Sequence, residues 1–561
     1  MKSEWQVRPG GESRVSTLAD LEHLLYQQRS LDAAAREAFL QPVYTRDIHD
    51  PHLLYGMQEA VDRIYRTVEK DERILVYGDY DVDGISSTAI MVSALQDIGA
   101  NVTPYLPHRT DDGYGVNRAV LEKLEREFDL LITVDCGVSN VEEINWLASK
   151  GKDTIVVDHH ELPKELPAAR AILHPRHPKG SYPWPSLCGA GMSWKLSQAL
   201  LRDERSPYAK DPDREKWLLD LALLGTIGDV MPLLGENRVI VKFGIEVLRR
   251  TRRPGLQALL DGANLSRGSL RVQDIAFRVI PLINAAGRID HPQAALDLLL
   301  APNMTRAIQC ATELMSLNKE RQAITRRIVQ EAERQVDPRS SIVFAADTTW
   351  PAGIVGLVAG QLASKFSRPA FILGGNGKHA VGSARTANRI NILEGLRTAE
   401  EYTLKLGGHI QAAGFSVEET NIAAFREQLQ VYFDKLPEPA GAGKTFTADA
   451  LVDPALLSWE TNRLLEQFAP FGEANPAPLF VLENMSVLDV RPVGKEGKHV
   501  KLTLATQAGR VDAIGFGLGD RLGSIDKEVD VLGSLETNEF RGSVRLQLSL
   551  KDVNTEQVLV R

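Results

Sequence analysis

Acidic residues and histidines gather at the ends of three short apolar segments of this chain. The segments read ILVYGDYDVD (74–83), LLITVDCG (130–137) and TIVVDHHE (154–161). Apolar, β-branched runs of this length that stop at Asp are typical of buried strands in a parallel sheet. Ligands of open α/β sheets bind outside the carboxyl ends of the strands, so these side chains should meet at one edge. The residues concerned are Asp79, Asp81, Asp83, Asp135, Asp158, His159 and His160.

So many carboxylates cannot stay ionised side by side without cations between them, which predicts a bound pair of metal ions. In DYDVD (79–83) the acids stand at positions i, i+2 and i+4, and on an extended strand end they would share one face. Gly84 then suits a helix start or a close approach to a phosphate. The alternative is an acidic turn at the surface. Asp135 is either a bridge between two metals or a helix cap or loop residue.

The DHHE segment (158–161) is the most specific of the three. Adjacent side chains on an extended segment point to opposite faces, so we expect one histidine to ligate a given metal. We assign that role to His159, and we place His160 nearer the substrate, where as a cation it would stabilise a phosphate oxygen. The alternative is a pair of exposed loop histidines. Oxygen-rich ligation with one imidazole favours Mn²⁺ or Mg²⁺ over a structural zinc.

A fourth acidic segment is less specific. GTIGDV (225–230) places Asp229 after the apolar run LLDLALLGTIG. By local chemistry Asp229 is either a further metal ligand or a residue of the loop that ends a helix.

Length and composition limit the class of protein. A chain of 561 residues predicts three or four domains. The net charge of −9 argues against a protein that coats duplex DNA, although a nucleic-acid substrate needs only a positive groove. Three cysteines that are far apart suit a reducing cytoplasm better than a disulfide scaffold. Neither a signal-peptide layout nor a membrane-length apolar run is present, so we expect a cytoplasmic protein without a membrane partner.

The pattern of the chain predicts several domains. Strands and helices alternate from about residue 50, which implies βαβ units. Residues 305–336 are long enough for a helix that spans between domains. The expected divisions are an N-terminal extension (1–45), a catalytic α/β domain (46–300), a linking helix (301–337), a second α/β domain (338–435), a linker rich in Pro, Gly and Ala (436–445) and a small β-barrel (446–561).

Several motifs resemble one enzyme superfamily. GDYDVDG (78–84), VDCG, DHH and GTIGDV, in this order, resemble the four motifs of the DHH phosphoesterases, and LGGHIQAAGF (406–415) resembles the signature of the associated DHHA1 domain. Four further segments are similar to the bacterial exonucleases of this superfamily that digest single-stranded DNA: PHRTDDGYGVN (107–117), NAAGR (284–288), GSART (382–386) and FAPFGEANPAPLF (468–480). The resemblance runs from about residue 45 to the C-terminus.

The resemblance implies a fold and an activity. The fold is α/β, with a parallel-sheet DHH domain, a long linking helix, a smaller α/β DHHA1 domain and a C-terminal OB-type barrel. The activity is 5′→3′ hydrolysis of single-stranded DNA to 5′-mononucleotides, in DNA repair and recombination. The alternative is a phosphodiesterase of the same superfamily that acts on short oligonucleotides or cyclic dinucleotides, but such relatives usually lack the barrel. Single-strand binding protein and a helicase are candidate partners, and a monomer is expected.

The resemblance also implies roles for individual residues at the metal centre. Asp81 and Asp83 would ligate the two divalent cations, Mn²⁺ or Mg²⁺, and Asp135 would bridge them. His159 and Asp229 would complete the shell of one cation. Asp79 would ligate or orient a ligand, and His160 would contact the scissile phosphate.

A second group of residues matches family positions that line a pocket for a 5′-terminal phosphate. They are Arg109, Arg288, Ser383 and Arg385, and the planar fork of Arg suits that task. Gly408 and His409 of the glycine-rich segment would hold phosphate oxygens. The alternatives are ordinary surface arginines and a glycine-rich turn packed against a helix. Pro351 and Ala474 depart from the family pattern, which commonly has His and Gly at these positions.

Basic residues elsewhere are candidates for contact with DNA. In the barrel, GKEGKHVKL (494–502) brings together Lys495, Lys498, His499 and Lys501, and Phe516 could stack on a base. The alternative is an ordinary basic hairpin. A second cluster, which faces either the DNA channel or solvent, comprises Arg249, Arg250, Arg252 and Arg253.

Overall fold

The computed structural model divides into two compact units. The larger comprises His49–Met231 and Ile240–Glu438, and the smaller comprises Met1–Ile48, Pro232–Val239 and Pro439–Arg561. The structure describes residues 4–109, 111–113, 115–375, 379–387, 390–436, 445–507, 509–540 and 543–554. Most of the predicted linker (436–445) therefore lies outside the described residues. Within the described ranges, no helix is both long enough and apolar enough to span a membrane.

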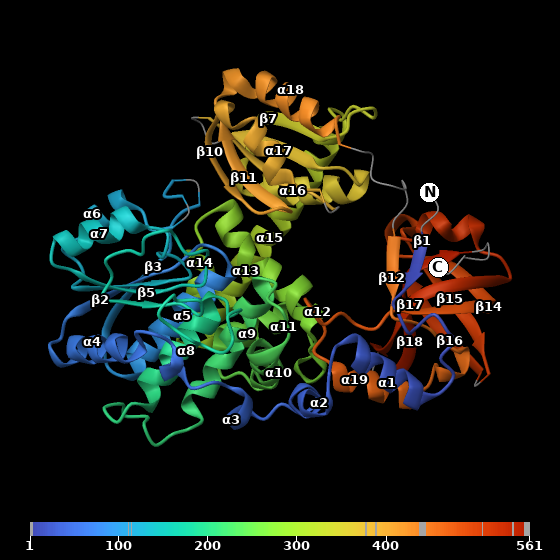
Figure 1. Cartoon of the computed structure of the whole chain (residues 1–561), viewed down its shortest axis with the longest axis horizontal. Coiled ribbons are helices and arrows are strands. Elements are labelled where there is room, and N and C mark those ends of the chain that lie inside the picture. Colours follow the sequence, from blue (N-terminus) through green and yellow to red (C-terminus); the bar gives the residue numbers. More distant parts are fainter. Residues whose placement is uncertain are drawn as a thin grey trace. The chain divides into compact units, whose positions relative to one another are not determined.

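A five-stranded parallel sheet forms the first part of the larger unit, and Figure 1 labels its strands β2, β3 and β5. The strand order is β3-β2-β4-β5-β6. Its strands β2, β4 and β5 are buried almost throughout, which explains their continuously apolar sequences. After β2 the chain forms β3 at one edge of the sheet, and it then crosses over to form β4, β5 and β6 on the other side of β2. The direction in which strands are added therefore reverses between β2 and β4, where ligands of such sheets bind. The strands are β2 (Arg73–Tyr77), β3 (Asn101–Tyr105), β4 (Leu130–Val134), β5 (Asp153–Val157) and β6 (Ala171–Leu173).

Helices surround this sheet and complete the predicted α/β domain. The helix α5 (Val82–Asp97) is buried along most of its length, where it packs against α8 and α9. The others are α4 (Met57–Glu69), α6 (Arg118–Leu124), α7 (Val141–Ser149), α8 (Gly189–Arg202), α9 (Leu219–Gly228), α10 (Gly235–Arg249), α11 (Pro254–Gly262), α13 (Ile280–Ile289) and α14 (Gln293–Leu299).

The helix α15 (Met304–Glu333) connects the first α/β domain to a second one and confirms the predicted linking helix. The second domain has a five-stranded sheet in the order β10-β11-β9-β8-β7. One face packs against α16 (Ala352–Phe366), and the other packs against α17 (Ile392–Thr398) and α18 (Ile422–Phe433). The strands are β7 (Val343–Pro351), β8 (Ala370–Gly375), β9 (Ala380–Arg385), β10 (Thr403–Gly408) and β11 (Ala412–Val417).

The smaller unit contains the predicted barrel. The long strand β14 pairs with β15 through its C-terminal part and with β17 through its N-terminal part, which closes the sheet. The barrel strands are β14 (Phe480–Val493), β15 (His499–Thr506), β16 (Gly509–Gly515), β17 (Glu528–Phe540) and β18 (Ser543–Asn554).

The N-terminal segment belongs to this smaller unit. The strand β1 (Glu4–Val7) pairs in parallel with β12 (Thr445–Ala448), more than 400 residues later in the chain (Figure 1). Leu21 and Leu25 of α1 (Leu18–Gln28) are buried in the same core as Leu465 of α19 (Trp459–Phe468). Trp5 is fully buried, and its Nε1–H donates to Asp552 Oδ2 at 2.9 Å.

We expect Trp5→Ala to destabilise the smaller unit by about 3–5 kcal/mol, because it removes a buried aromatic ring and one buried hydrogen bond to Asp552. Urea unfolding of the full-length chain, followed by circular dichroism, measures the change. Gln6→Ala is the matched control, because Gln6 is exposed on the same strand. Equal unfolding midpoints for the two variants would show that this strand does not stabilise the unit.

Candidate metal centre

The three acids of DYDVD lie on a loop and a helix start, not on a strand. The strand β2 ends at Tyr77, and Asp81 is the N-cap of α5, where its carboxylate accepts hydrogen bonds from the N–H groups of Asp83 at 2.9 Å and Gly84 at 3.2 Å. The expectation that the acids share one face of an extended segment is therefore wrong. An Asp that satisfies unpaired N–H groups at a helix start favours the helix over a longer strand. The helix α5 accordingly begins at Val82, within the acidic motif itself.

Gly84 and the NAAGR segment fix this loop. A Cβ at Gly84 would lie 2.5 Å from the carbonyl oxygen of Asp79, so the loop folds directly onto the first turn of α5. The Oδ1 of Asn284 accepts a hydrogen bond from the N–H of Val82 at 2.8 Å. A Cβ at Gly287 would lie 2.7 Å from the carbonyl oxygen of Tyr80. The NAAGR segment of α13 thus contacts the backbone of the acidic loop through Asn284 and Gly287.

Asp135 follows β4 in a strained backbone conformation. Its φ of +59° is in the left-handed region, which costs a residue with a Cβ about 1–2 kcal/mol. Its N–H donates to the carbonyl oxygen of Val157 at 3.0 Å, which holds the residue at the sheet edge. A Cβ at Gly189 would lie 2.5 Å from the Cβ of Asp135, so α8 also approaches it closely. Such strain persists only where the surrounding structure enforces it, and it is commonest at functional sites.

Asp83 is held by the N-terminus of α8. The N–H groups of Gly189 and Ala190 donate to its two carboxylate oxygens at 2.7 Å and 2.9 Å. A Cβ at Gly225 would lie 2.2 Å from Asp83 Oδ1, so glycine is required on α9 as well. Sequence reasoning missed the contact of Asp83 with α8 and its contact with α9. The signal for the contact with α8 is the run of small residues CGAG (188–191), which follows an apolar residue at a helix start.

The DHH motif forms a turn after β5. Asp158 Oδ1 accepts hydrogen bonds from the N–H groups of His159 at 2.7 Å and His160 at 3.1 Å, and Oδ2 accepts from the N–H of Val138 at 2.9 Å. The two imidazole rings lie 4.5 Å apart, so the expectation that they point to opposite faces is wrong. The reason is that β5 ends at Val157, and the turn that follows does not alternate its side chains. Asp158 anchors the turn.

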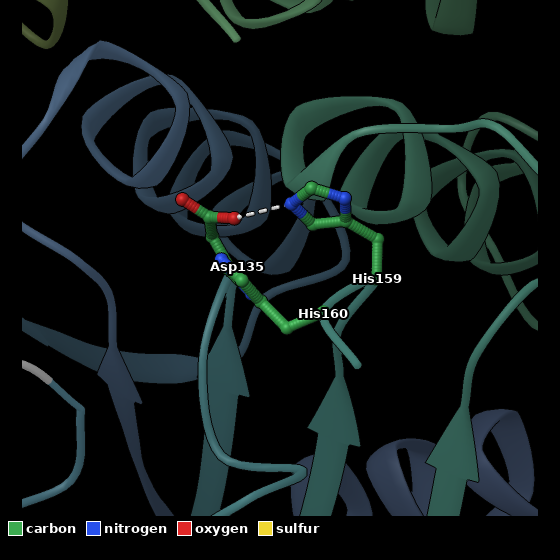
Figure 2. A group of neighbouring side chains, drawn as sticks. All are labelled: Asp135, His159 and His160. Carbon is green, nitrogen blue, oxygen red and sulfur yellow. Dashed lines mark hydrogen bonds and ion pairs between the residues drawn. The ribbon is translucent and has the colours of Figure 1, made fainter. Parts of the chain in front are cut away.

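His159 is the point where the acids converge. Its Nε2 lies 3.2 Å from Asp135 Oδ1, and Figure 2 shows the imidazole directed at that carboxylate. The same nitrogen is 3.7 Å from Asp229 Oδ2 and 3.8 Å from Asp83 Oδ2. Burial lowers the pKa of His159, which favours the neutral imidazole that a metal requires.

The ligand atoms form two adjacent groups. Asp83, His159 and Asp229 each place one such atom within 4.8 Å of the others, and so do Asp79, Asp81 and Asp135. Asp135 also belongs to a group with His159 and His160, so it connects the two sets. The structure therefore brings together every residue that the sequence predicted for the metal centre, including Asp229, which caps the C-terminus of α9.

The electrostatics of the site call for cations. Burial, and then the charge of Asp81, raises the pKa of Asp79 to about 8, and burial and the charge of Asp83 do the same for Asp229. The same two causes raise the pKa of Asp81 and that of Asp135. Asp79 Oδ1 is buried and has no hydrogen-bond partner among the described residues. Carboxylate oxygens with a single imidazole fit Mn²⁺ or Mg²⁺.

His160 differs from His159 in charge. Burial alone would lower its pKa, but the hydrogen bond between its Nδ1 and Asp158 Oδ1 at 2.7 Å raises the pKa to about 9. The pair with Asp158 therefore favours the cationic form of His160, whereas burial favours the neutral form of His159.

Arginines gather next to the acids. The guanidinium of Arg109 lies 4.1 Å from the ring centroid of Tyr80, and its Nε is buried with no hydrogen-bond partner among the described residues. Burial, and then Arg109 and Arg321, lower the pKa of Arg288 to about 10. Burial and Arg109 also lower the pKa of Arg385. Arg321 of α15 is a member of this cluster that sequence reasoning missed.

The start of α16 completes this arginine cluster. Arg288 Nη1 donates to the carbonyl oxygen of Gly353 at 3.3 Å. A Cβ at Gly356 would lie 3.3 Å from Ser383 Oγ and 3.5 Å from Arg385 Nη2. Pro351, which departs from the family pattern, is the N-cap of this helix. The structure thus brings Arg109, Arg288, Ser383 and Arg385 together.

Gly408 is the last residue of β10 and His409 follows it, and both are exposed. The φ of Gly408 is +145°, and a Cβ there would lie 2.4 Å from the Cα of Ala413. The N–H of His409 donates to the carbonyl oxygen of Ala412 at 2.8 Å, and Ala412 is the neighbour of Arg385 in the sheet. The segment is therefore next to the arginine cluster.

The predicted basic clusters have acidic and aromatic partners within the chain. Lys501 pairs with Asp512 at 2.7 Å and Lys498 with Glu496 at 3.0 Å, whereas the side chain of Lys495 lies outside the described residues. Phe516 is 66% exposed, and its ring makes an edge contact with His499.

Three of the four arginines in 249–253 are engaged in the same way, and Arg250 is exposed. Arg249 pairs with Glu246, Arg253 pairs with Asp220 at 3.2 Å, and Arg252 lies over the ring of Trp217.

Ala474, where the family commonly has Gly, adopts a φ of +58°, which explains the usual glycine.

Comparison with known proteins agrees with this architecture. Residues 73–226 match the DHH family N-terminal domain, residues 339–435 the DHHA1 domain and residues 448–552 the RecJ OB domain. The chain is 34% identical to the single-stranded-DNA-specific exonuclease RecJ of Bacillus subtilis, over 98% of this chain and 71% of that protein. The chain belongs to the RecJ family.

Further relatives extend the comparison. RecJ of Escherichia coli is 33% identical over 89% of this chain and 90% of that protein. The crystal structure of RecJ from Thermus thermophilus in complex with Mn²⁺ matches with a TM-score of 0.83 and 30% identity, over 100% of this chain and 80% of that chain. The same RecJ with Mg²⁺ matches with a TM-score of 0.78.

We expect the stability of the metal-free protein to fall as the pH rises from about 4 to about 8. Asp79 and Asp229 have an ordinary pKa of 3.8 and a folded-state pKa of about 8, so in this range the folded chain binds more protons than the unfolded chain. Divalent cations replace these protons, so Mn²⁺ affinity should rise over the same range and level off above it. Calorimetric titration in buffers of different ionisation enthalpy counts the protons released. Release of no proton at neutral pH would contradict the crowded-carboxylate account.

Proposed function

We propose that this protein is a single-stranded-DNA-specific exonuclease that digests DNA from the 5′ end and releases 5′-mononucleotides. The observation that supports this most strongly is the pair of ligand groups joined at Asp135 and placed beside an arginine cluster. The names of the RecJ relatives support the choice of single-stranded DNA as substrate.

The residues present fit two divalent cations. Asp83, His159 and Asp229 would hold one and Asp79 and Asp81 the other, with Asp135 between them. When bound, the cations would lower the pKa of a water molecule and offset charge on the phosphate. The complexes of the Thermus relative with Mn²⁺ and Mg²⁺ support the choice of metal.

His160 would act on the scissile phosphate. Its Nδ1 is committed to Asp158, so Nε2 is the atom that would donate to a phosphate oxygen. Asp158 fixes the ring and keeps it cationic, as the raised pKa of His160 indicates. Charge that develops on the phosphate during hydrolysis would be stabilised by this donor.

The arginine cluster would bind the 5′-terminal phosphate. Arg109 lowers the pKa of Arg288 and that of Arg385, so an anion among the three arginines relieves repulsion. Ser383 Oγ is an additional donor beside the first turn of α16. Gly408 and His409, in the neighbouring exposed segment, would contact the same phosphate. A pocket for a chain end next to the metal centre would give digestion from the 5′ side.

The remaining parts have proposed roles in DNA binding. The barrel (446–561) would bind the DNA strand through Lys495, Lys498, Lys501 and Phe516. The nuclease itself would consist of the catalytic domain (46–300), the linking helix (301–337) and the DHHA1 domain (338–435). The N-terminal extension (1–45) and the linker (436–445) complete the proposed division. We further propose a cytoplasmic monomer that works in DNA repair and recombination with single-strand binding protein and a helicase.

We expect Asp135→Asn to reduce nuclease activity by more than about 100-fold, because it removes the carboxylate shared by both ligand groups. Release of nucleotides from 5′-labelled and 3′-labelled single strands in Mn²⁺ measures activity and polarity together. Glu142→Gln on the exposed face of α7 is the control. A folded Asp135→Asn protein with full activity would refute the assignment of the metal centre, and turnover of cyclic dinucleotides alone would refute the substrate.

We expect Arg385→Ala to lower the preference for a 5′-phosphate over a 5′-hydroxyl end by about 10-fold or more, because one charge-assisted hydrogen bond contributes about 1.5–3 kcal/mol. The ratio of kcat/KM for the two substrates measures this preference. Arg397→Ala, on the exposed side of α17, should leave the ratio unchanged. An unchanged ratio in Arg385→Ala would place the 5′-phosphate elsewhere.

A further inference from the structure

We propose that His174, in the loop after β6, is a positioning residue for the metal centre, which holds the turn that carries His159 and His160. Arg176 supports the same turn. The inference rests on the proposed metal centre and adds two residues that belong to none of its motifs.

The strand pairing places His174 beside the DHH turn. The strands β5 and β6 run parallel, and the N–H of Asp158 donates to the carbonyl oxygen of Leu173 at 3.1 Å. The next residue, His174, is 1% exposed. Its Nε2 lies 2.8 Å from the carbonyl oxygen of His160. The contact is thus made inside the protein.

The hydrogen bonds of His174 fix its tautomer. The backbone N–H of Arg176 lies 3.0 Å from His174 Nδ1, and because an N–H can only donate, Nδ1 is the acceptor. The proton of the neutral imidazole is then on Nε2, which donates to the carbonyl oxygen of His160. One ring therefore joins the loop after β6 to the loop after β5.

Arg176 holds the preceding carbonyl. Its Nη2 donates to the carbonyl oxygen of His159 at 3.2 Å, while Nη1 pairs with Glu161 at 3.1 Å. Asp158 already binds the N–H groups of both histidines. All four backbone polar groups of His159 and His160 are consequently bonded to three side chains. The turn lies outside a strand or helix, so these side chains supply the restraint that a regular element would otherwise give.

The direction of His159 depends on this restraint. Its Nε2 must reach Asp135, Asp83 and Asp229 at once, and a small rotation of the turn would separate it from all three. Residues that orient metal ligands commonly change metal affinity or activity by about 10- to 100-fold when they are replaced. We therefore expect His174 to affect Mn²⁺ affinity although it contacts no metal.

Two substitutions of His174 separate its two hydrogen bonds. In His174→Asn the side-chain oxygen can still accept from the N–H of Arg176, as in an Asx turn, but the amide is too short to reach the carbonyl oxygen of His160. In His174→Gln the longer amide can reach that carbonyl oxygen, and the short-range turn is lost. A positioning role predicts that Asn is the damaging replacement and that Gln restores function. A role confined to the shape of the loop predicts the reverse order.

Calorimetric titration of the full-length, metal-free protein with MnCl₂ is the primary measurement. We expect His174→Asn to raise the Mn²⁺ dissociation constant by about 10-fold and His174→Gln to keep it close to that of the unchanged protein. His177→Asn is the matched control, because His177 lies in the same loop with a similar Nδ1 contact, to the N–H of Lys179, and its ring stacks on Tyr55. Urea unfolding of each variant checks the fold.

The outcomes are distinct from those that test the nuclease. Mn²⁺ binding that is equal in His174→Asn and His177→Asn, or weaker in Gln than in Asn, would overturn the proposal. If His174→Asn fails to fold, Arg176→Gln replaces it, since the side chain of Arg176 is 43% exposed and its loss should be tolerated. Unchanged Mn²⁺ binding in Arg176→Gln would then overturn it. Absence of nuclease activity with normal Mn²⁺ binding would refute the proposed function and leave this inference standing.

Discussion

Repulsion among buried carboxylates is the constraint on which the larger unit depends. Asp79, Asp81, Asp135 and Asp229 each have a raised pKa because burial and a neighbouring Asp act in the same direction. A fold that brings these groups together loses free energy unless protons or cations offset the charge. The arrangement fits a site for divalent cations, and it explains why metal binding, protonation and stability should vary together.

The surrounding backbone reduces this repulsion where it can. The N-terminus of α8 donates two hydrogen bonds to Asp83, and the first turn of α5 donates two to Asp81. Helix N-termini carry partial positive charge, so they interact favourably with both carboxylates. Glycine on α8 and α9 allows the close approach, because a Cβ at Gly189 or Gly225 would overlap an acid.

The opposite charge is concentrated a short distance away. Arg288 stands four positions after Asn284, which binds the acidic loop, and it also contacts the first turn of α16. The helix α13 thus touches both the acids and the DHHA1 domain. A phosphate chain with its end among the arginines would offset their charge and place its next bond near the acids and their cations, which is the physical basis of the proposed digestion from the 5′ end.

The sequence by itself determined the parallel sheet, the long helix, the barrel and the identity of the acids, because buried strands and the Asp residues that follow them leave a local pattern. It failed where orientation depends on distant parts of the chain. The acids of DYDVD meet through a helix cap and Asn284, and the two histidines lie side by side because Asp158, His174 and Arg176 shape their turn. Only the tertiary structure decided these contacts, since hydrogen bonds between segments far apart in sequence leave no periodic signal. The pairing of β1 with β12 has the same cause.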